Sequence, residues 1–308
     1  MEQPLVSVPV ITYNSSKFVL ETLESIKAQT YQNIELIISD DCSTDNTVEL
    51  CQEWVEQNKV RFVRTQIITS ELNTGVSANL NRAEAACQGE WVKGIAGDDL
   101  LMPDCIEQYI SYVQLYPNTT YLFGRVETFG GNEESNRHFM ENVFDFTFFD
   151  LDIDVQLRRL IYGENCIPAS TLFYNRNFSI DNGIINDERI PLLEDWPKWI
   201  RLLELGVRFK FLDKKVVKYR LHKNSLSTNK FSINYYQSVL LFELYYRYPR
   251  WQNDNADNAI KHMVEIQLNT VKELWENMKY LEQQNNKILT SHSYKLGKKI
   301  ISLFHFFN

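Results

Sequence analysis

The sequence predicts an α/β fold with a mostly parallel sheet and flanking helices, followed by a helical C-terminal extension. Over the first hundred or so residues, strand-like and helix-like segments alternate, which is typical of βαβ units. With 308 residues, 44% of them hydrophobic and 23% charged, the chain has the composition of an ordinary globular protein. From about residue 232 onward the pattern becomes helical.

Four apolar runs in the first hundred residues predict strands, at residues 5–11, 34–39, 62–68 and 91–96. Between them, apolar residues recur every three or four positions, which predicts amphipathic helices. The positions that define these helices are Val19, Leu23 and Ile26, then Val48, Cys51 and Val55, then residues 76–86.

The middle of the chain continues the mixture of strands and helices. Its expected elements are an amphipathic helix at residues 106–113, strands at 121–129, 170–174 and 208–219, and a helix that follows Glu194-Asp195. In that last helix, Trp199, Ile200 and Leu203 are expected to face inward. Residues 130–150 are aromatic and acidic with little periodicity, so we expect an irregular connection there.

Charge and cysteine content exclude several classes of protein. A formal net charge of -8 disfavours nucleic acid as the main partner, because phosphate binding depends on clustered Lys and Arg. The five cysteines are scattered without C-x-x-C spacing, so neither a disulfide framework nor a zinc site is expected. The sequence shows neither a signal peptide nor a run of 18 apolar residues, and a cytoplasmic location is therefore expected.

Polar side chains follow the predicted strands where each strand ends. Because ligands of open α/β sheets bind at the carboxyl ends of the strands, we expect these side chains to share one edge. They are Tyr13, Asn14, Asp40, Asp41, Asp98 and Asp99. The adjacent carboxylates Asp98 and Asp99 follow Gly97 and are suited to a hard divalent cation and, through it, a diphosphate. As an alternative, adjacent acids after a strand serve only as turn formers and helix caps.

Several other residues have the right chemistry for a site. Either Asp40 or Asp41 has the place of acids that accept hydrogen bonds from a base or ribose, and Tyr13 either stacks on a base or only packs at the strand end. Glu194-Asp195 begins a helix and supplies either a general base or an ordinary N-terminal cap. His222 follows a strand in a polar segment, where it is either a common surface histidine or completes a metal shell.

Several runs, in order and at compatible spacing over about residues 5–228, resemble family 2 glycosyltransferases of the GT-A fold. The runs are Val6-Ser7-Val8 through Thr12-Tyr13-Asn14, residues 39–47, Asn73-Thr74-Gly75-Val76-Ser77, Gly97-Asp98-Asp99 through Met102-Pro103-Asp104, Glu194-Asp195-Trp196, and Tyr219-Arg220-Leu221-His222 with Ser225.

This resemblance implies an inverting transfer of a sugar from a nucleotide diphosphate donor, with a UDP-sugar expected, to a glycan or lipid-linked saccharide in cell-surface polysaccharide synthesis. By position, it implies that Tyr13 and Asp41 contact the base, that Asp98 contacts the ribose, and that Asn81 contacts the donor. It also implies that Asp99 and His222 bind Mn²⁺ or Mg²⁺ and that Asp195 is the general base.

The resemblance also implies how the chain is organised. Residues 1–110 would form the nucleotide-sugar half of the GT-A domain, 111–228 the acceptor half, and 229–308 a helical extension with a basic and aromatic tail. The sequence departs from the family pattern at two places. Pro9 lies inside the first strand, where it removes a ladder donor. Leu80 stands where many relatives carry Arg, so only Asn81 of that pair is carried over.

Other nucleotide-binding classes fit less well. A nicotinamide dehydrogenase would have G-x-G-x-x-G after the first strand, where Tyr13-Asn14-Ser15-Ser16 occurs instead. A P-loop enzyme would have Lys and Ser or Thr where Ile95 and Ala96 stand. A sugar nucleotidyltransferase would have a Gly-rich basic loop after the first strand. A catalytically silent nucleotide-binding or scaffold subunit is disfavoured because the carboxylates for cation and base are all retained.

The C-terminal extension carries two patterns. Apolar residues at two heptad positions predict a short coiled coil or bundle, through which a homodimer would form: Ile260, Leu274, Leu281 and Ile288, and Val264, Val271 and Met278. From residue 294 the tail combines lysines with Ile, Leu and Phe and is too short to span a membrane. It fits either a peripheral contact with the inner membrane face or a packed terminal helix.

Overall fold

The computed structural model describes residues 3–222 and 233–253, together with separate residues between 269 and 291. The chain divides into two compact units, Met1–Lys230 and Phe231–Asn308. The expected heptad residues except Leu281, and the whole tail from residue 294, lie outside the described residues.

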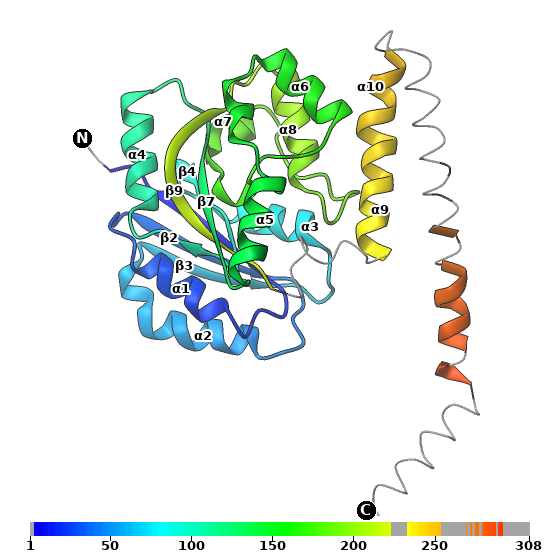
Figure 1. Ribbon diagram of the computed structural model, residues 1–308. Helices are drawn as coiled ribbons and strands as arrows, with labels where there is room; N and C mark the ends of the chain where they lie inside the picture. Colours follow the sequence, from blue (N-terminus) through cyan, green and yellow to red (C-terminus); the bar gives the residue numbers. More distant parts are fainter. Residues whose placement is uncertain are drawn as a thin grey trace, which may run out of the picture. The chain divides into compact units, whose positions relative to one another are not determined.

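The first unit is built on one mixed, mostly parallel sheet (Figure 1). Its strands are β1 (Val6–Thr12), β2 (Ile34–Asp40), β3 (Arg64–Thr69), β4 (Trp91–Val92), β5 (Ile95–Ala96), β6 (Leu100–Leu101), β7 (Tyr121–Phe129), β8 (Phe173–Asn175) and β9 (Lys210–Arg220). They are ordered β3-β2-β1-β4-β8-β7-β9-β6, and β5 also pairs with β1. The pairs β1–β2, β2–β3, β1–β4 and β1–β5 are parallel, as predicted for the first hundred residues. The pair β7–β9 is also parallel, whereas β4–β8, β7–β8 and β6–β9 are antiparallel.

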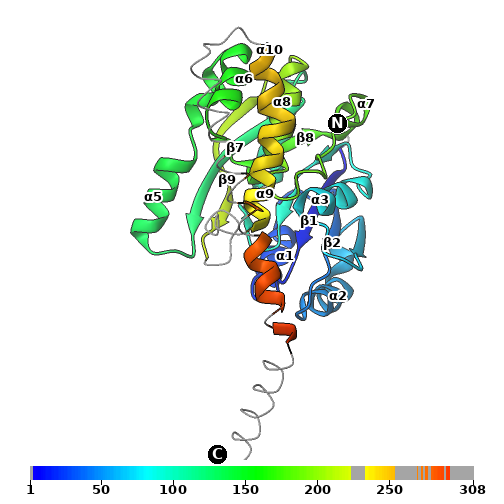
Figure 2. The ribbon, with the colours of Figure 1, turned by 90° about the vertical axis from the view of Figure 1, so that its right-hand side faces the viewer.

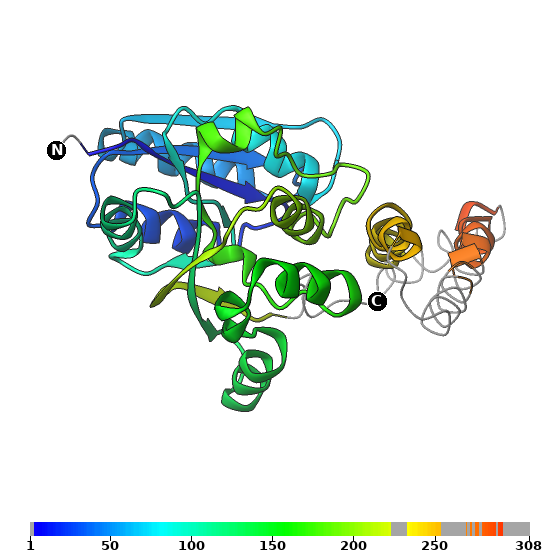
Figure 3. The same ribbon diagram turned by 90° about the horizontal axis from the view of Figure 1, so that it is seen from above.

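Helices pack on both sides of this sheet (Figure 3). They are α1 (Val19–Lys27), α2 (Thr47–Asn58), α3 (Val76–Ala85), α4 (Cys105–Leu115), α5 (Glu133–Val143), α6 (Ile153–Tyr162), α7 (Arg176–Asp181) and α8 (Asp195–Glu204), with short 3₁₀ turns η1 (Lys59–Arg61), η2 (Phe146–Asp150) and η3 (Ala169–Thr171). The predicted inward residues Trp199, Ile200 and Leu203 of α8 are buried. The central strands are buried on both faces, which is why β1 and β2 read as continuous apolar runs.

The strand expected at residues 91–96 is wrong in detail, because it is two short strands separated by Lys93 and Gly94. Both pair in parallel with β1, Ser7 opposite Val92 and Val10 opposite Ile95. Pro9 lies between those two pairs and has no N–H to continue the ladder, which accounts for the break. At the break the buried Lys93 ammonium donates to the carbonyls of Gly94 and Ser170, both at 2.7 Å.

The irregular connection expected at residues 130–150 is also wrong. Residues 133–143 form α5, and residues 146–150 form η2. The side chain of Asn132 caps α5 by accepting from the backbone N–H of Ser135, and Phe139 stacks on Tyr219 of β9 with 5.5 Å between ring centroids. This helix is stabilised by a cap and by tertiary contacts that a periodicity search does not detect.

In the second unit, the described residues 233–253 are helical throughout (Figure 2). They form α9 (Ile233–Phe242), a π-helical turn η4 (Glu243–Arg247) and α10 (Tyr248–Asn253). The Arg247 guanidinium lies 2.7 Å from the Glu243 carboxylate, one turn away. Within the part of the chain that the structure describes, no helix is both long and apolar enough to cross a membrane.

Candidate active site

Hydrogen bonds join the end of β1 and the loop after it to the end of β2 and the loop that follows. Thr12 and Asp40 are register partners, and the Thr12 hydroxyl donates to the Asp40 carboxylate at 2.8 Å. Asn14 has a left-handed backbone with φ of 50°, and its side-chain oxygen accepts from the backbone N–H of Thr44 at 2.8 Å. Tyr13, between them, keeps 49% of its surface exposed. Its ring is therefore available to a ligand at this edge of the sheet.

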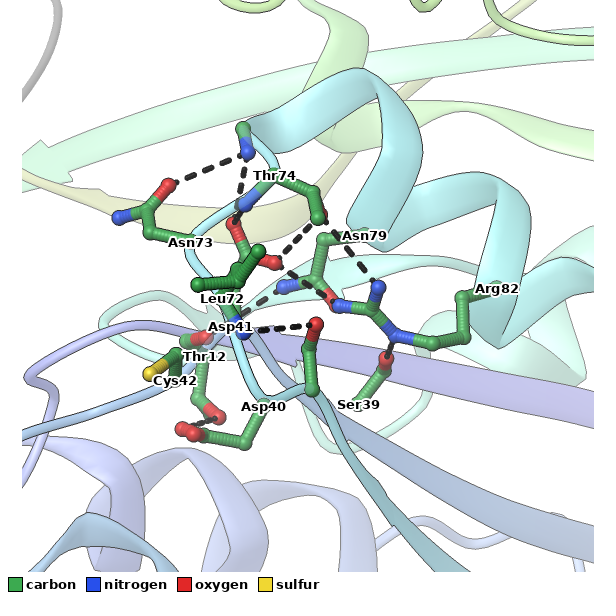
Figure 4. Close-up of polar contacts among 12 residues, drawn as sticks. Thr12, Ser39, Asp40, Asp41, Cys42, Leu72, Asn73, Thr74, Asn79 and Arg82 are labelled. Carbon is green, nitrogen blue, oxygen red and sulfur yellow. Dashed lines mark hydrogen bonds and ion pairs between the residues drawn. The ribbon is translucent and has the colours of Figure 1, made fainter.

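Asp41 is buried and fully hydrogen-bonded (Figure 4). Its carboxylate accepts from the backbone N–H groups of Thr74 and Gly75 at 2.9 and 2.8 Å and from the Thr74 hydroxyl at 2.6 Å. The fourth donor is Arg82 of α3 at 2.9 Å, whose Nε also donates to the hydroxyl of Ser39. Sequence reasoning missed Arg82, because nothing in the local pattern shows that it reaches Asp41.

The turn that carries Asp98 and Asp99 lies against β1. The N–H of Gly97 donates to the Ile11 carbonyl at 2.9 Å. A Cβ at Gly97 would come within 2.8 Å of the Thr12 methyl, so this close approach requires glycine. Neither carboxylate caps α4, whose N-cap residue is Asp104. The two acids are therefore free of the ordinary capping role at this helix.

The two carboxylates have different surroundings. The side chain of Asp98 is partly exposed, and its Oδ2 lies 2.9 Å from Nε2 of His222. Asp99 is buried, and its Oδ1 accepts the backbone N–H of Arg220 at 2.9 Å. Burial, together with the neighbouring charge of Asp98, raises the pKa of Asp99 well above its usual range. A cation held by Asp99 would use its second oxygen, Oδ2.

Arg220 holds this turn in place. Its Nε donates to the carbonyl of Asp98 at 2.7 Å, and its guanidinium pairs with Glu21 of α1 at 2.9 Å. The same group lies over the rings of Phe18 and Phe129, 4.5 and 4.3 Å from their centroids. Arg220 belongs to the same run as His222, but its role depends on residues from three distant parts of the chain.

Asp195 opens α8 with its carboxylate held at both oxygens. Oδ2 accepts from the Asn165 amide, and Oδ1 accepts from the backbone N–H of Trp196, both at 2.7 Å. Burial raises the pKa of Asp195, and the hydrogen bond from Asn165 acts in the opposite direction. Burial and the charge of Asp195 also raise the pKa of Glu194 to about 8. A carboxylate with a raised pKa is a better proton acceptor than an ordinary one.

Asn81 faces the segment that leads toward Asp195. Its amide nitrogen donates to the Asn186 carbonyl and to the Glu188 carboxylate, both at 2.9 Å. Its oxygen accepts from the backbone N–H and from the side chain of Asn186, both at 2.9 Å. These four bonds use the whole hydrogen-bonding capacity of the amide.

The residues expected to hold a cation are Asp99 and His222, beside Asp98. Among residues 3–222 and the described residues beyond them, no group of three or more His, Cys, Asp or Glu side chains has the arrangement of a complete metal site. Mg²⁺ and Mn²⁺ are commonly bound by one or two protein ligands together with substrate phosphates. Carboxylate oxygens suit both ions. The donor set therefore fits an ion that is completed by a diphosphate.

Comparison with known proteins identifies the family. The model described as glycosyl transferase family 2 matches residues 7–179. An uncharacterized glycosyltransferase of Haemophilus influenzae is 26% identical, over 98% of this chain and 90% of its own. A putative teichuronic acid biosynthesis glycosyltransferase, TuaG of Bacillus subtilis, is 26% identical over 74% of this chain and 83% of its own. Chondroitin synthase of Escherichia coli is 26% identical over 75% of this chain but 31% of its own.

Solved structures agree on the fold. The structure of residues 1–349 of S. aureus TarS in complex with UDP-GlcNAc has a TM-score of 0.60 and 21% sequence identity, over 78% of this chain and 66% of that one. The same TarS segment in complex with UDP has a TM-score of 0.58 over 96% of this chain and 78% of that one. The chain thus belongs to glycosyltransferase family 2 and is a transferase with the GT-A fold.

Proposed function

We propose that this protein is an inverting glycosyltransferase that moves a sugar from a UDP-sugar to a hydroxyl group of a glycan or lipid-linked saccharide in cell-surface polysaccharide synthesis. The observation that carries the proposal is the Asp98-Asp99 turn, which lies beside the end of β1 and is fixed by Arg220. The bound UDP-GlcNAc of TarS supports a UDP-sugar donor. The names of TuaG and chondroitin synthase support a saccharide acceptor.

The donor nucleotide would bind across the ends of β1 and β2. The exposed ring of Tyr13 would stack on the base, and Asp98 would accept hydrogen bonds from the ribose hydroxyls. Asp41 already accepts four hydrogen bonds, so a base that contacts it would replace one of those donors. Its main contribution would then be to shape the Thr74-Gly75 loop beside the base.

A divalent cation would be held by Asp99 and His222, next to Asp98. When bound there with the donor, it would offset the negative charge that develops on the departing diphosphate. The contact between Asp98 Oδ2 and His222 Nε2, at 2.9 Å, supports this location because it brings the His222 imidazole beside the two-aspartate turn. Arg220 would keep the two carboxylates in position with or without the bound cation.

Asp195 would act as the general base. Its carboxylate would take the proton of the acceptor hydroxyl as the acceptor oxygen bonds to the anomeric carbon and the bond from that carbon to the diphosphate oxygen breaks. A single displacement of this kind inverts the anomeric carbon and needs no enzyme nucleophile. The raised pKa of Asp195 and its fixed orientation through Asn165 support this role.

A screen of nucleotide sugars tests the proposal. UDP and UDP-sugars, GDP-sugars and dTDP-sugars are tested with Mn²⁺ or Mg²⁺ for thermal stabilisation and for release of the nucleotide diphosphate. We expect metal-dependent stabilisation by UDP and release of UDP from at least one UDP-sugar. Stabilisation by UDP and Mn²⁺ without turnover of any donor would favour a silent nucleotide-binding subunit. Absence of both effects would reject the proposal.

We also propose a cytoplasmic enzyme that touches the inner membrane face through residues 294–308 and dimerises through its C-terminal helices. The support is the mixture of lysines with Ile, Leu and Phe in the tail and the heptad spacing before it. Truncation at residue 293 is expected to abolish binding to anionic vesicles, which is measured by flotation. Sedimentation of the full-length protein measures whether it is a dimer. Unchanged flotation of the truncated protein would dismiss the membrane contact.

A further inference from the structure

Helix α3 has two polar faces that serve different parts of the molecule. Successive residues of an α-helix are about 100° apart, so residues 77, 81 and 84 share one face and residues 79 and 82 share the opposite one. On the second face, Asn79 donates to the Thr12 carbonyl at 3.3 Å, and Arg82 donates to Asp41 at 2.9 Å. This face rests on the strand ends where the donor is proposed to bind.

The first face holds the segment that precedes α8. The backbone N–H of Ser77 donates to the Pro191 carbonyl at 3.2 Å, and its buried hydroxyl donates to the Ile190 carbonyl. A Cβ at Gly75, just before α3, would lie 2.7 Å from the Pro191 Cβ. Segment 190–191 is thus in direct contact with the beginning of α3.

Asn81 holds the same segment four residues earlier. Its amide bonds to both the backbone N–H and the carbonyl of Asn186, as a neighbouring strand would, and its nitrogen also donates to Glu188. The Asn186 side chain is buried and donates back to the Asn81 oxygen at 2.9 Å. A side chain used in this way positions a loop and has no hydrogen bond left for a ligand.

The same face also reaches α8 directly. The Lys198 ammonium lies 3.5 Å from the Glu84 carboxylate, and both side chains are mostly buried. Lys198 is one turn after Asp195 in α8. Helix α3 therefore contacts the chain both before and after the position of the proposed base.

We infer that Asn81 is a positioning residue that fixes residues 186–191, and through them Asp195, and that it does not contact the donor. This inference rests on the proposed role of Asp195 as the base. Helix α3 then contacts the strand ends at the proposed donor site through Arg82, and it contacts residues 186–191, which lead to Asp195, through Ser77 and Asn81. A general base must lie within hydrogen-bonding reach of its proton, so a small displacement of this segment reduces turnover sharply.

The inference predicts a split between binding and turnover. In Asn81→Ala, turnover at saturating donor should fall by about 10-fold to 100-fold, while the dissociation constant of UDP with Mn²⁺ stays within about twofold. Ser77→Ala should give a smaller loss of the same kind, because it removes a single hydroxyl donor. Arg82→Ala, on the opposite face, should instead weaken UDP binding. Asn182→Ala is the matched control, since the exposed side chain of Asn182 donates only to the Phe178 carbonyl among its described contacts.

The test uses the full-length protein, with UDP binding measured by titration calorimetry and turnover by release of UDP from UDP-GlcNAc or from the UDP-sugar that the screen identifies. UDP binding that weakens in Asn81→Ala in proportion to turnover would show a donor contact and overturn the inference. Unchanged turnover would also overturn it. If Asn81→Ala does not fold, Ser77→Ala decides by the same two readouts.

A parallel Asp195→Asn variant separates this inference from the proposed function. Full turnover in Asp195→Asn would reject the base assignment itself. Loss of turnover in Asp195→Asn, with wild-type turnover in both Asn81→Ala and Ser77→Ala, would reject the positioning role alone.

Discussion

The backbone N–H of Arg220, the last residue of β9, donates a 2.9 Å hydrogen bond to the buried carboxylate of Asp99, 121 residues earlier in the chain. The Arg220 side chain bonds to the carbonyl of Asp98 at 2.7 Å. The end of β9 and the two-aspartate turn therefore form one unit. The position of the carboxylates depends on a strand from the other half of the sheet, which a reading of the turn alone does not reveal.

Arg220→Lys should destabilise the protein and weaken its response to metal. Lysine keeps the charge but lacks the planar fork that bonds to Asp98 and Glu21 while lying over Phe18 and Phe129. We expect a loss of about 1–3 kcal/mol in the free energy of unfolding, measured with urea, and a smaller thermal shift with UDP and Mn²⁺. Arg208→Lys, at an exposed position, should change neither. Equal behaviour of the two variants would refute the role of Arg220.

Gly75→Ala should be more harmful than the same change at Gly183. Both glycines have positive φ, 87° and 61°, so alanine strains the backbone at each. At Gly75 the new Cβ would also meet Pro191 at 2.7 Å, whereas at Gly183 nothing lies within 4 Å. We expect a loss of about 1–2 kcal/mol at Gly183 and a clearly larger loss at Gly75, with turnover impaired only at Gly75. Similar losses at both sites would show that the contact with Pro191 is unimportant.

Asn165→Ala should move the acidic limb of the pH–turnover profile to higher pH. The amide of Asn165 donates to the ionised carboxylate of Asp195 and so lowers its pKa against the effect of burial. Without that donor the pKa of Asp195 rises further, and the base becomes ionised only at higher pH. Initial rates between pH 5 and 9 measure this shift, with Asn182→Ala as the control. An acidic limb that stays in place in Asn165→Ala would mean that Asp195 does not limit the rate.

Glu194→Gln should become more stable than the wild type as the pH rises. Burial and Asp195 raise the pKa of Glu194 to about 8 in the folded protein, above its value in the unfolded chain. The folded state then binds the proton more tightly, so stability is greatest below the unfolded pKa and is lost as the pH rises through about 8. Urea unfolding at pH 5 and pH 8.5 should show a difference between the proteins that grows by about 1–3 kcal/mol. A constant difference between the two proteins would contradict the shift, with Glu49→Gln at an exposed position as the control.

Strong periodicity and apolar runs were sufficient for most of the fold. Ile106, Tyr109 and Ile110 recur at helical spacing and are buried in α4. The apolar runs at residues 5–11 and 34–39 form β1 and β2, because strands covered on both faces need no polar alternation. The parallel order of these strands then brings Tyr13 and Asp41 to one edge.

The remaining features depend on partners that are distant in sequence. Asn81 meets Asn186, which is 105 residues later, and Arg82 meets Asp41, so neither contact has a local signature. The break between β4 and β5 depends on Pro9 in a different strand. The local pattern of apolar residues therefore predicted which helices and strands form. The hydrogen-bond partners of their polar side chains depend on tertiary contacts.

Donor binding and sugar transfer in Asp195→Asn test the proposed role of Asp195 most directly. The amide that replaces the Asp195 carboxylate has almost the same shape but cannot take a proton from the acceptor. The residues proposed to bind the donor are unchanged. The UDP dissociation constant should stay within about twofold of the wild type, and turnover should fall by about 10²-fold to 10⁴-fold. Wild-type turnover in Asp195→Asn, with UDP binding intact, would contradict that role.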